Sequence, residues 1–436
     1  MLGFMLTAMF LSMWLNNMAT TLMVLPIVDS VVSEICSRAQ DTDRARRASA
    51  DVAVQLQEAD SWKAAESATN SKPLPASTHV PQSWTGEQRK FHNAMLLGIA
   101  YAANIGGTGS VLGTAPNLVL MGLIEDQYPN ATELTFATWM VYNVPPMLVC
   151  TVLAWLYLYY RCTPARYRNN KSEHAAIHDA IQDRYRDLGP LSFHEGAVLT
   201  IFILTVLVWF FRDPYFVTGW SSLFILQRKI RDATPAMFAV ALLFLIPAKP
   251  RSDPAGPRLL TWKVVQKKIP WGVLLLMGGS FSMAEASTKS GLAVKVGSYL
   301  TELDFMPQAL LVSVVSIFTT MITEVTSNTA TASVLLPITS YLAKALHIHP
   351  LYLMMPVTIS ASFAFMLPIA TPPNAMVYEH GGMPMSYMAR AGFIMNVGCV
   401  IIELLAINSL GVLVFNLNTF PSWAGDANVT VPTSPP

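Results

Sequence analysis

Two polar motifs, each present twice, interrupt the long apolar stretches of this sequence. The first pair is Asn17-Met18-Ala19-Thr20, followed after five residues by Pro26-Ile27, and Asn328-Thr329-Ala330-Thr331, followed after five residues by Pro337-Ile338. The second pair is Thr114-Ala115-Pro116-Asn117 and Thr371-Pro372-Pro373-Asn374. The motifs follow the same order in both halves of the chain, which indicates an internal repeat.

Asn and Thr give these motifs their chemistry. Their side-chain oxygens, together with backbone carbonyls freed by a helix break, are ligands suited to a hard cation such as Na⁺. The Asn amide N–H and the N–H groups at a helix N-terminus suit a carboxylate or a sulfate. Neither Lys nor Arg lies within the motifs, so a bound anion would need its counter-charge from co-bound cations. The motifs therefore predict cation-coupled uptake of an anion.

Other ionisable residues near the motifs admit a functional and a structural interpretation. Glu324 either assists a cation site or carries a proton, or it is a carboxylate satisfied by neighbouring Thr and backbone groups. Glu285 and Lys289 are four residues apart on one helical face and can simply pair. His347 and His349 lack an accompanying Cys or Asp cluster, so we expect no zinc site and sodium as the only metal ion.

The composition places the motifs inside a membrane. Charged residues make up 13% of the 436 residues, about half of the roughly 25% usual for globular proteins, and 53% are hydrophobic. The net charge of +1 gives no basic field for nucleic acid, and the motifs of common enzyme classes are absent from the sequence. The four cysteines are too few for a disulfide framework and are expected to be free thiols. We expect an all-α polytopic membrane protein that is not an enzyme.

The distribution of Lys and Arg predicts the orientation. Loops 37–92, 161–193 and 248–270 are rich in both and are expected in the cytoplasm, whereas 125–135 and the tail 416–436 contain neither and are expected outside. The glycosylation sequons at Asn130 and Asn428 fall in these outside segments, and the sequon at Asn170 falls in a cytoplasmic loop. The C-terminus is therefore predicted to be extracellular, and the membrane is expected to be the plasma membrane.

The repeat divides the chain. From Asn17 to Asn117 the spacing is 117 − 17 = 100 residues, and from Asn328 to Asn374 it is 374 − 328 = 46, a difference of 54 that the charged loop 37–92 accounts for. The orientation makes the repeat inverted, with interrupted helices near the membrane midplane as in secondary transporters. We expect a first re-entrant hairpin over 1–34, a flexible cytoplasmic insertion over 35–92, a broken helix over 93–124, connecting and scaffold helices over 125–307, a second hairpin over 308–346, a second broken helix over 347–380, and a last helix with an extracellular tail over 381–436.

The segment from Ser360 to Val377 resembles the signature of the divalent anion:sodium symporter family. Ser327-Asn328-Thr329, Gly278-Gly279-Ser280 and Phe420-Pro421-Ser422-Trp423 are also similar to family motifs. The resemblance implies sodium-coupled transport of citrate, dicarboxylates or sulfate, a homodimer in the lipid bilayer, and an elevator-like mechanism without an organic cofactor. It also implies two sets of site residues. The substrate would be bound by Asn17, Thr114, Asn328, Thr329 and Thr371, and sodium by Asn16, Asn17, Gly107, Thr108, Asn117, Ser327, Asn328, Ala370 and Asn374.

The chain differs from the family pattern in two ways. The first hairpin has Asn16-Asn17-Met18 in place of Ser-Asn-Thr, which favours weakened sodium dependence and leaves a sodium-independent citrate exchanger as an alternative. Family members also carry about four helices before the first hairpin. A short form that associates with a longer relative as a non-transporting regulatory subunit is therefore a second alternative, and a sulfate transporter is a third.

Overall fold

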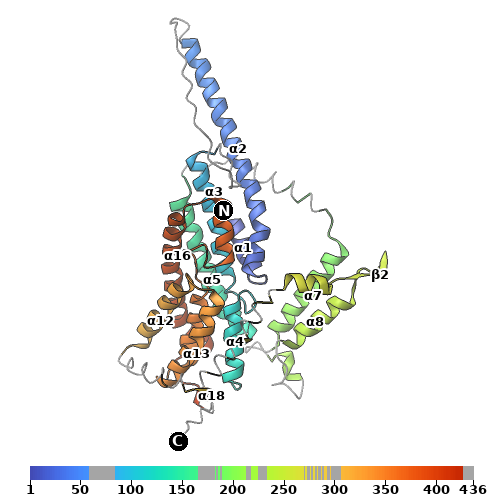
Figure 1. Cartoon of the computed structure of the whole chain (residues 1–436), viewed down its shortest axis with the longest axis vertical. Coiled ribbons are helices and arrows are strands. Elements are labelled where there is room, and N and C mark those ends of the chain that lie inside the picture. The colour runs from blue at the N-terminus through green and yellow to red at the C-terminus, as the bar shows by residue number, and fades with distance from the viewer. Residues whose placement is uncertain are drawn as a thin grey trace.

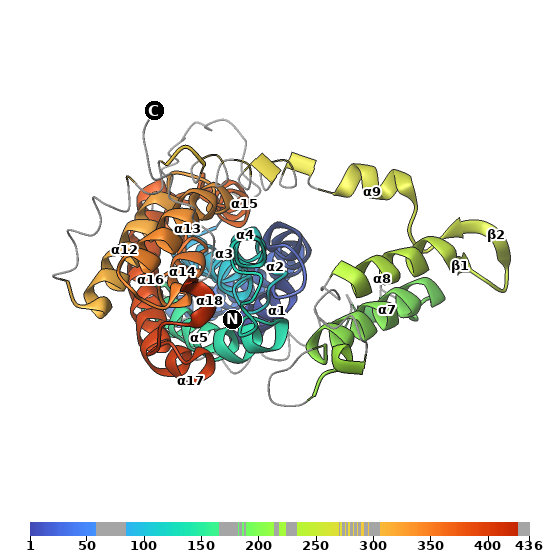
Figure 2. The same cartoon turned by 90° about the horizontal axis from the view of Figure 1, so that it is seen from below.

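The structure, a computed structural model, describes residues 1–57, 84–164, 189–212, 218–223, 233–269 and 306–425, with scattered positions within 182–186 and 271–295. Of residues 38–57 only the helical backbone is described. Asn170, Glu285, Asn428 and residues 58–83 of the predicted insertion lie outside these ranges. The described part is mostly helical, and it consists of a bundle and a smaller group of elements to one side (Figures 1 and 2).

The first motif lies where two antiparallel helices meet. Helix α1 (Leu2–Ser12) is followed by a four-residue turn and by α2 (Asn17–Gln57). Asn16 caps α2, because its Oδ1 accepts the backbone N–H of Ala19 at 2.9 Å. The predicted hairpin over 1–34 therefore corresponds to α1 and the first part of α2. The second helix continues to Gln57, well into the segment predicted as a flexible insertion.

The matching helix pair of the second half is α12 (Gln308–Thr323) and α13 (Asn328–Ala345). Ser327 caps α13, since its hydroxyl oxygen accepts the N–H of Ala330 at 3.2 Å. Asn16 and Ser327 therefore cap corresponding helices, Asn16 with its amide oxygen and Ser327 with its hydroxyl oxygen. The α1–α2 pair occupies the upper half of the bundle in Figure 1, and α12–α13 the lower half.

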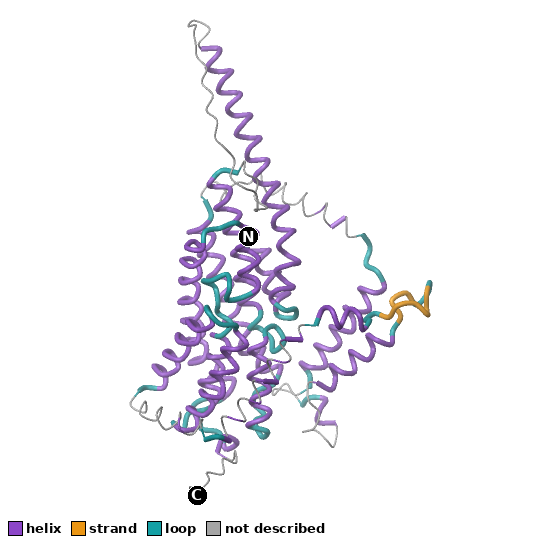
Figure 3. Tube along the Cα trace, viewed as in Figure 1, coloured by secondary structure: helices purple, strands orange, loops and turns teal. Residues whose placement is uncertain are grey.

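Two helices break where the second motif occurs. Helix α3 (Gly86–Gly106) is followed by residues 107–114 and by α4 (Ala115–Gln127). Likewise α14 (Pro350–Ser360) is followed by residues 361–371 and by α15 (Pro372–Gly381). Thr114 and Thr371 are extended, with φ of −146° and −142°, and a proline in the next turn starts each new helix. Both breaks are visible as loop segments inside the bundle (Figure 3).

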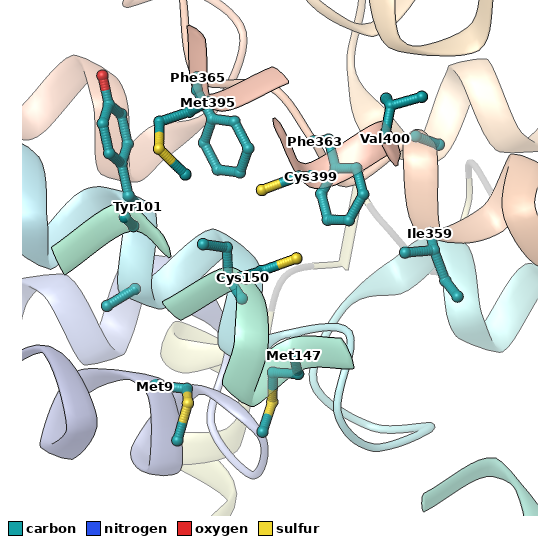
Figure 4. Close-up of a cluster of buried hydrophobic side chains, with 14 of the residues drawn as sticks. Met9, Tyr101, Met147, Cys150, Ile359, Phe363, Phe365, Met395, Cys399 and Val400 are labelled. Atoms are coloured by element: carbon teal, nitrogen blue, oxygen red, sulfur yellow. The ribbon is translucent and has the colours of Figure 1, made fainter. Parts of the chain in front are cut away.

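The core lies around α3 and α14. Residues from Phe91 to Gly106 of α3 and all residues of α14 are buried, as expected for helices surrounded by others. Helix α5 (Phe136–Tyr157) and helix α16 (Met385–Ala406) pack against them, and α16 leads through Ile407–Gly411 into α17 (Val412–Phe415) and α18 (Ser422–Gly425). Figure 4 shows this core, with Tyr101, Met147, Cys150, Phe363, Phe365, Met395 and Cys399 packed together.

The smaller group comprises α7 (Phe193–Phe210), α8 (Ala233–Leu245), strands β1 (Pro247–Lys249) and β2 (Asp253–Arg258), and α9 (Trp262–Lys268). The strands pair antiparallel, with Pro247 opposite Arg258 and Lys249 opposite Asp253. The all-α prediction was therefore wrong for this hairpin, whose one glycine and four prolines disfavour a helix. Aromatic rings connect α7 to the bundle, with Trp14 and Phe202 in edge contact at 5.9 Å.

Several helices have the length and composition of membrane spans. Among the described residues, four satisfy both conditions, namely Asn17–Ser37, Phe136–Cys162, Phe193–Phe210 and Met385–Phe415. The span in α7 is almost entirely exposed in the isolated chain although it is strongly apolar, as a lipid-facing helix requires. These properties are those of a mostly helical membrane protein.

Candidate functional site

Three oxygen atoms meet at the tip of the first hairpin. The Ser12 hydroxyl lies 2.6 Å from Oδ1 of Asn17 and 2.7 Å from the carbonyl oxygen of Ala103. A hydroxyl group has one hydrogen and can donate to only one of these oxygens at a time. The other short contact then brings two oxygens together without a proton between them, an arrangement that a cation would stabilise.

The second hairpin repeats this arrangement. The Thr323 hydroxyl lies 2.8 Å from Oδ1 of Asn328 and 2.7 Å from the carbonyl oxygen of Ala361. Thr323 precedes Asn328 by five residues, as Ser12 precedes Asn17. In both halves the hydroxyl ends one helix of the hairpin, the Asn begins the other, and the carbonyl belongs to the broken helix beside them.

The asparagines of the second motif stabilise the backbone of the two helix breaks through hydrogen bonds. Nδ2 of Asn117 donates to the carbonyls of Gly107 (3.0 Å) and Ser110 (2.8 Å). Nδ2 of Asn374 donates to the carbonyls of Ala364 (2.9 Å) and Leu367 (3.1 Å). The acceptors lie ten and seven residues before the Asn in each case. Oδ1 of Asn117 is buried and has no hydrogen-bond partner among the described residues, so it is an oxygen available to a cation.

Glycine lets the first break approach the first hairpin. A Cβ added to Gly107 would lie 2.6 Å from Oδ1 of Asn17, well inside contact distance. A Cβ on Gly113 would lie 2.5 Å from the Gly107 carbonyl and 2.8 Å from the Ser12 carbonyl. A side chain at either position would push the break away from the hairpin. Asn17, Gly107 and Asn117, three residues for which the family resemblance implies sodium binding, thus lie close together.

Asn104 connects the two halves. Its Nδ2 faces the carbonyl of Ala364 (3.2 Å), Oγ1 of Thr371 (3.1 Å) and Oδ1 of Asn374 (3.2 Å). Its Oδ1 accepts a long hydrogen bond from Nδ2 of Asn17 at 3.4 Å. Asn104 is fully buried, so these contacts replace water entirely. The first hairpin and the second break therefore share one amide side chain.

Glu324 joins the second hairpin to the second break. Its carboxylate accepts the backbone N–H groups of Phe365 (2.8 Å), Met366 (3.0 and 3.1 Å to the two oxygens) and Leu367 (3.1 Å). It also accepts Nδ2 of Asn396 on α16 at 2.7 Å. Both oxygens face donors, which agrees with the structural interpretation of this residue and disfavours a role as proton carrier. The partners are backbone groups and an amide, and not the neighbouring Thr residues that the sequence suggested.

The remaining predicted residues contribute differently. Thr108 donates its hydroxyl to the carbonyl of Ile105 (2.7 Å), and its own carbonyl accepts Nε1 of Trp139 at 3.0 Å. Ala370 can offer only its backbone. Thr114 and Thr371 begin α4 and α15 without a capping side-chain bond, and Thr329 is buried next to Asn328. Asn130 is exposed between α4 and α5.

Ser12, Asn104, Thr323 and Asn396 were not predicted. The equal five-residue spacing from Ser12 and Thr323 to the two asparagines is a signal that could have found them. Asn104 and Asn396 have no such signal, because their roles depend on helices that are distant in sequence.

A helical membrane protein with two polar hairpin tips, each beside a broken helix, belongs by this architecture to the class of secondary transporters. Residues 1–417 match the family described as the sodium:sulfate symporter transmembrane region, and the chain belongs to this family of transporters, whose members are not enzymes. It is 37% identical over 449 residues to the Na(+)/citrate cotransporter of Rattus norvegicus, covering 97% of this chain and 77% of that one. It is 38% identical to solute carrier family 13 member 2 of Homo sapiens (100% and 77% covered) and 36% identical to the human Na(+)/dicarboxylate cotransporter 3 (100% and 77% covered).

Proposed function

We propose that this protein takes up di- and tricarboxylates such as citrate and succinate, coupled to sodium, by an elevator-like movement. The observation that carries the proposal is the repeated cluster of three oxygens with a single hydrogen, Ser12–Asn17–Ala103 and Thr323–Asn328–Ala361. Na⁺ prefers such neutral oxygen ligands. The relatives named for citrate and dicarboxylates support the choice of substrate.

Each cluster would hold one sodium ion. In the first half Ser12 and Ala103 would be joined as ligands by Asn16, Asn17, Gly107, Thr108 and Asn117. In the second half Thr323 and Ala361 would be joined by Ser327, Asn328, Ala370 and Asn374. The ions would supply the positive charge that an anion needs, since the hairpin turns and the breaks contain no Lys or Arg.

The carboxylates of the substrate would lie between the two ions. Asn17, Asn328 and Thr329 offer amide or hydroxyl donors from the hairpins, and Thr114 and Thr371 offer hydroxyls at the starts of α4 and α15. Helix N-termini carry a positive dipole end and free N–H groups, which suit a carboxylate. No cofactor is required.

The arrangement in space supports an inverted repeat of two re-entrant hairpins. Helix α12 has 16 residues, fewer than the roughly 20 needed to span a membrane, and the pairs α1–α2 and α12–α13 lie in opposite halves of the bundle (Figure 1). In the elevator-like movement, the bundle would slide relative to α7 past the aromatic contact between Trp14 and Phe202. The exposed apolar side chains of α7 and α8 would face lipid and a second copy of the chain.

Uptake into proteoliposomes tests the function. An inward sodium gradient should raise uptake of radiolabelled citrate or succinate about tenfold over a potassium gradient. Asn117→Ala should raise the sodium concentration for half-maximal uptake about tenfold, because the variant loses a sodium ligand and the two hydrogen bonds that hold the carbonyls of Gly107 and Ser110. The exposed Asn130→Ala is the matched control and should change neither.

Other outcomes would favour the alternatives. Citrate uptake that ignores sodium and depends on internal citrate indicates an exchanger, and uptake of sulfate alone indicates a sulfate transporter. If the purified chain moves none of these anions but lowers transport by a longer relative, it is a regulatory subunit.

Glycosylation tests the orientation in the plasma membrane. Asn130→Gln and Asn428→Gln should each remove one glycosidase-sensitive increment of mass from protein made in mammalian cells, because both sites are proposed to be extracellular. Asn170→Gln is the control and should change nothing. Loss of the increment only in Asn170→Gln would reverse the orientation.

A further inference from the structure

One carboxylate and two imidazoles form a cluster apart from the polar motifs. Asp29 lies on α2, His92 on α3 and His380 on α15. Nε2 of His92 is 2.6 Å from Oδ1 of Asp29, and Nε2 of His380 is 2.7 Å from Oδ2. One ligand atom from each residue lies within 4.8 Å of the other two. This cluster was not predicted from the sequence, in which only His347 and His349 suggested a metal pair.

We propose that Asp29, His92 and His380 bind a transition metal ion of the zinc type. Two imidazole nitrogens and one carboxylate oxygen form a frequent zinc ligand set, with the fourth position open to water or another ligand. Imidazole ligands favour zinc, copper and nickel, whereas Na⁺ prefers oxygen ligands. The site would therefore not compete for the coupling ion, and its occupancy would be independent of the proposed sodium sites.

The geometry needs only small side-chain movements. Zinc bonds of about 2.0–2.2 Å in a tetrahedron place neighbouring ligand atoms about 3.3 Å apart. The two contacts of Asp29, at 2.6 and 2.7 Å, would open by less than about 1 Å, and the two imidazole ligand atoms already lie within 4.8 Å of each other. A metal ion would then replace the hydrogens that now lie between the rings and the carboxylate.

The surroundings of His92 leave its ring available for this change. Nδ1 of His92 is buried and has no hydrogen-bond partner among the described residues, so no other polar group in that part of the chain fixes the tautomer. The hydrogen can reside on Nδ1, which leaves the lone pair of Nε2 for the metal. The Trp84 ring meets the His92 ring edge-on at 5.2 Å and restricts its rotation.

The cluster is reachable from solvent. The side chain of His92 is 2% exposed, but those of His380 and Asp29 are 19% and 31% exposed. His380 is the penultimate residue of α15, so a metal ion would enter at the end of that helix. Because the three ligands come from three helices, the bound ion would hold the first hairpin against both broken helices and would stabilise the folded bundle.

Zinc titration of the purified full-length chain tests the proposal. After treatment with EDTA, the protein should bind one equivalent of Zn²⁺ by calorimetry, bind Co²⁺ with visible ligand-field absorption, and unfold at a temperature at least about 3 °C higher with saturating zinc. His380→Gln and Asp29→Asn should each weaken zinc binding about tenfold or more and abolish the cobalt absorption. His380 and Asp29 are partly exposed, and each replacement is similar in size to the side chain it replaces, so the chain should still fold.

His194→Gln provides the matched control, since His194 is an exposed histidine on α7. It should leave zinc binding, the cobalt spectrum and the thermal shift unchanged. Equal zinc binding by the control and by His380→Gln would overturn the proposal, as would the absence of binding by the unaltered chain. These measurements need neither sodium nor substrate, so they separate this site from the proposed transport function.

Discussion

Glu324→Gln is expected to lower the free energy of unfolding by about 3 kcal/mol. The carboxylate accepts three backbone N–H groups and one amide N–H, and every one of these donors is directed at an oxygen. Glutamine replaces one oxygen by an NH₂ group, so at least one buried donor loses its acceptor and faces another donor. A buried N–H donor without an acceptor lowers the stability by about 1–3 kcal/mol, and by more when the lost acceptor was charged.

Thermal unfolding in detergent, followed by tryptophan fluorescence, measures this effect. Glu379→Gln is a suitable control, because Glu379 lies exposed on α15 and its replacement should change the stability by no more than about 0.5 kcal/mol. Equal stability of the two variants would contradict the structural role of Glu324. A variant that stays folded but loses pH-dependent transport would restore the proton-carrier hypothesis.

Asn104→Ala is expected to weaken sodium binding about tenfold or more at both proposed sites. Asn104 contacts Asn17 of the first cluster and Thr371 and Asn374 of the second break, at 3.1 to 3.4 Å. Its removal leaves these side chains free to rotate, and each lost hydrogen bond costs about 0.5–1.5 kcal/mol. The sodium dependence of uptake should also become less steep, because the amide that links the two sites is gone.

Two measurements check the Asn104 prediction. Sodium-dependent uptake gives the concentration for half-maximal transport, and the rise of the unfolding temperature with sodium gives binding even when transport is lost. Asn143→Ala is the control, since Asn143 is also buried but makes one bond, to the Trp139 carbonyl at 3.2 Å. Unchanged sodium dependence in Asn104→Ala would show that the sites are independent.

The helix interruptions could be read from the sequence because local chemistry causes them. Pro116 and Pro372 start new helices, and Asn117 and Asn374 reach back to carbonyls seven and ten residues earlier, so both breaks depend on short-range contacts. The interruption predicted within 93–124 falls between Gly106 and Ala115. The continuation of α2 to Gln57 was not predicted, since polar composition alone does not distinguish a polar helix from a loop.

The contacts between distant helices could not be predicted. Asn104 and Thr371 are 267 residues apart, and Asp29 and His380 are 351 apart. Nothing in the local pattern around His92 or His380 indicates that both rings point at one carboxylate. The Asn at position 16, which the sequence predicts to weaken sodium dependence, caps α2 as Ser327 caps α13, and the weakened sodium dependence stays a prediction.

The unbroken course of α2 has a mechanical consequence. This helix has 41 residues and begins at the tip of the first hairpin, and its last 20, residues 38–57, add about 30 Å at 1.5 Å per residue. A stiff rod of that length acts as a lever, so a tilt of the hairpin by about 10° would move the far end by about 5 Å. A spin label or fluorophore near Gln57 would therefore register small movements of the first hairpin as large changes in distance.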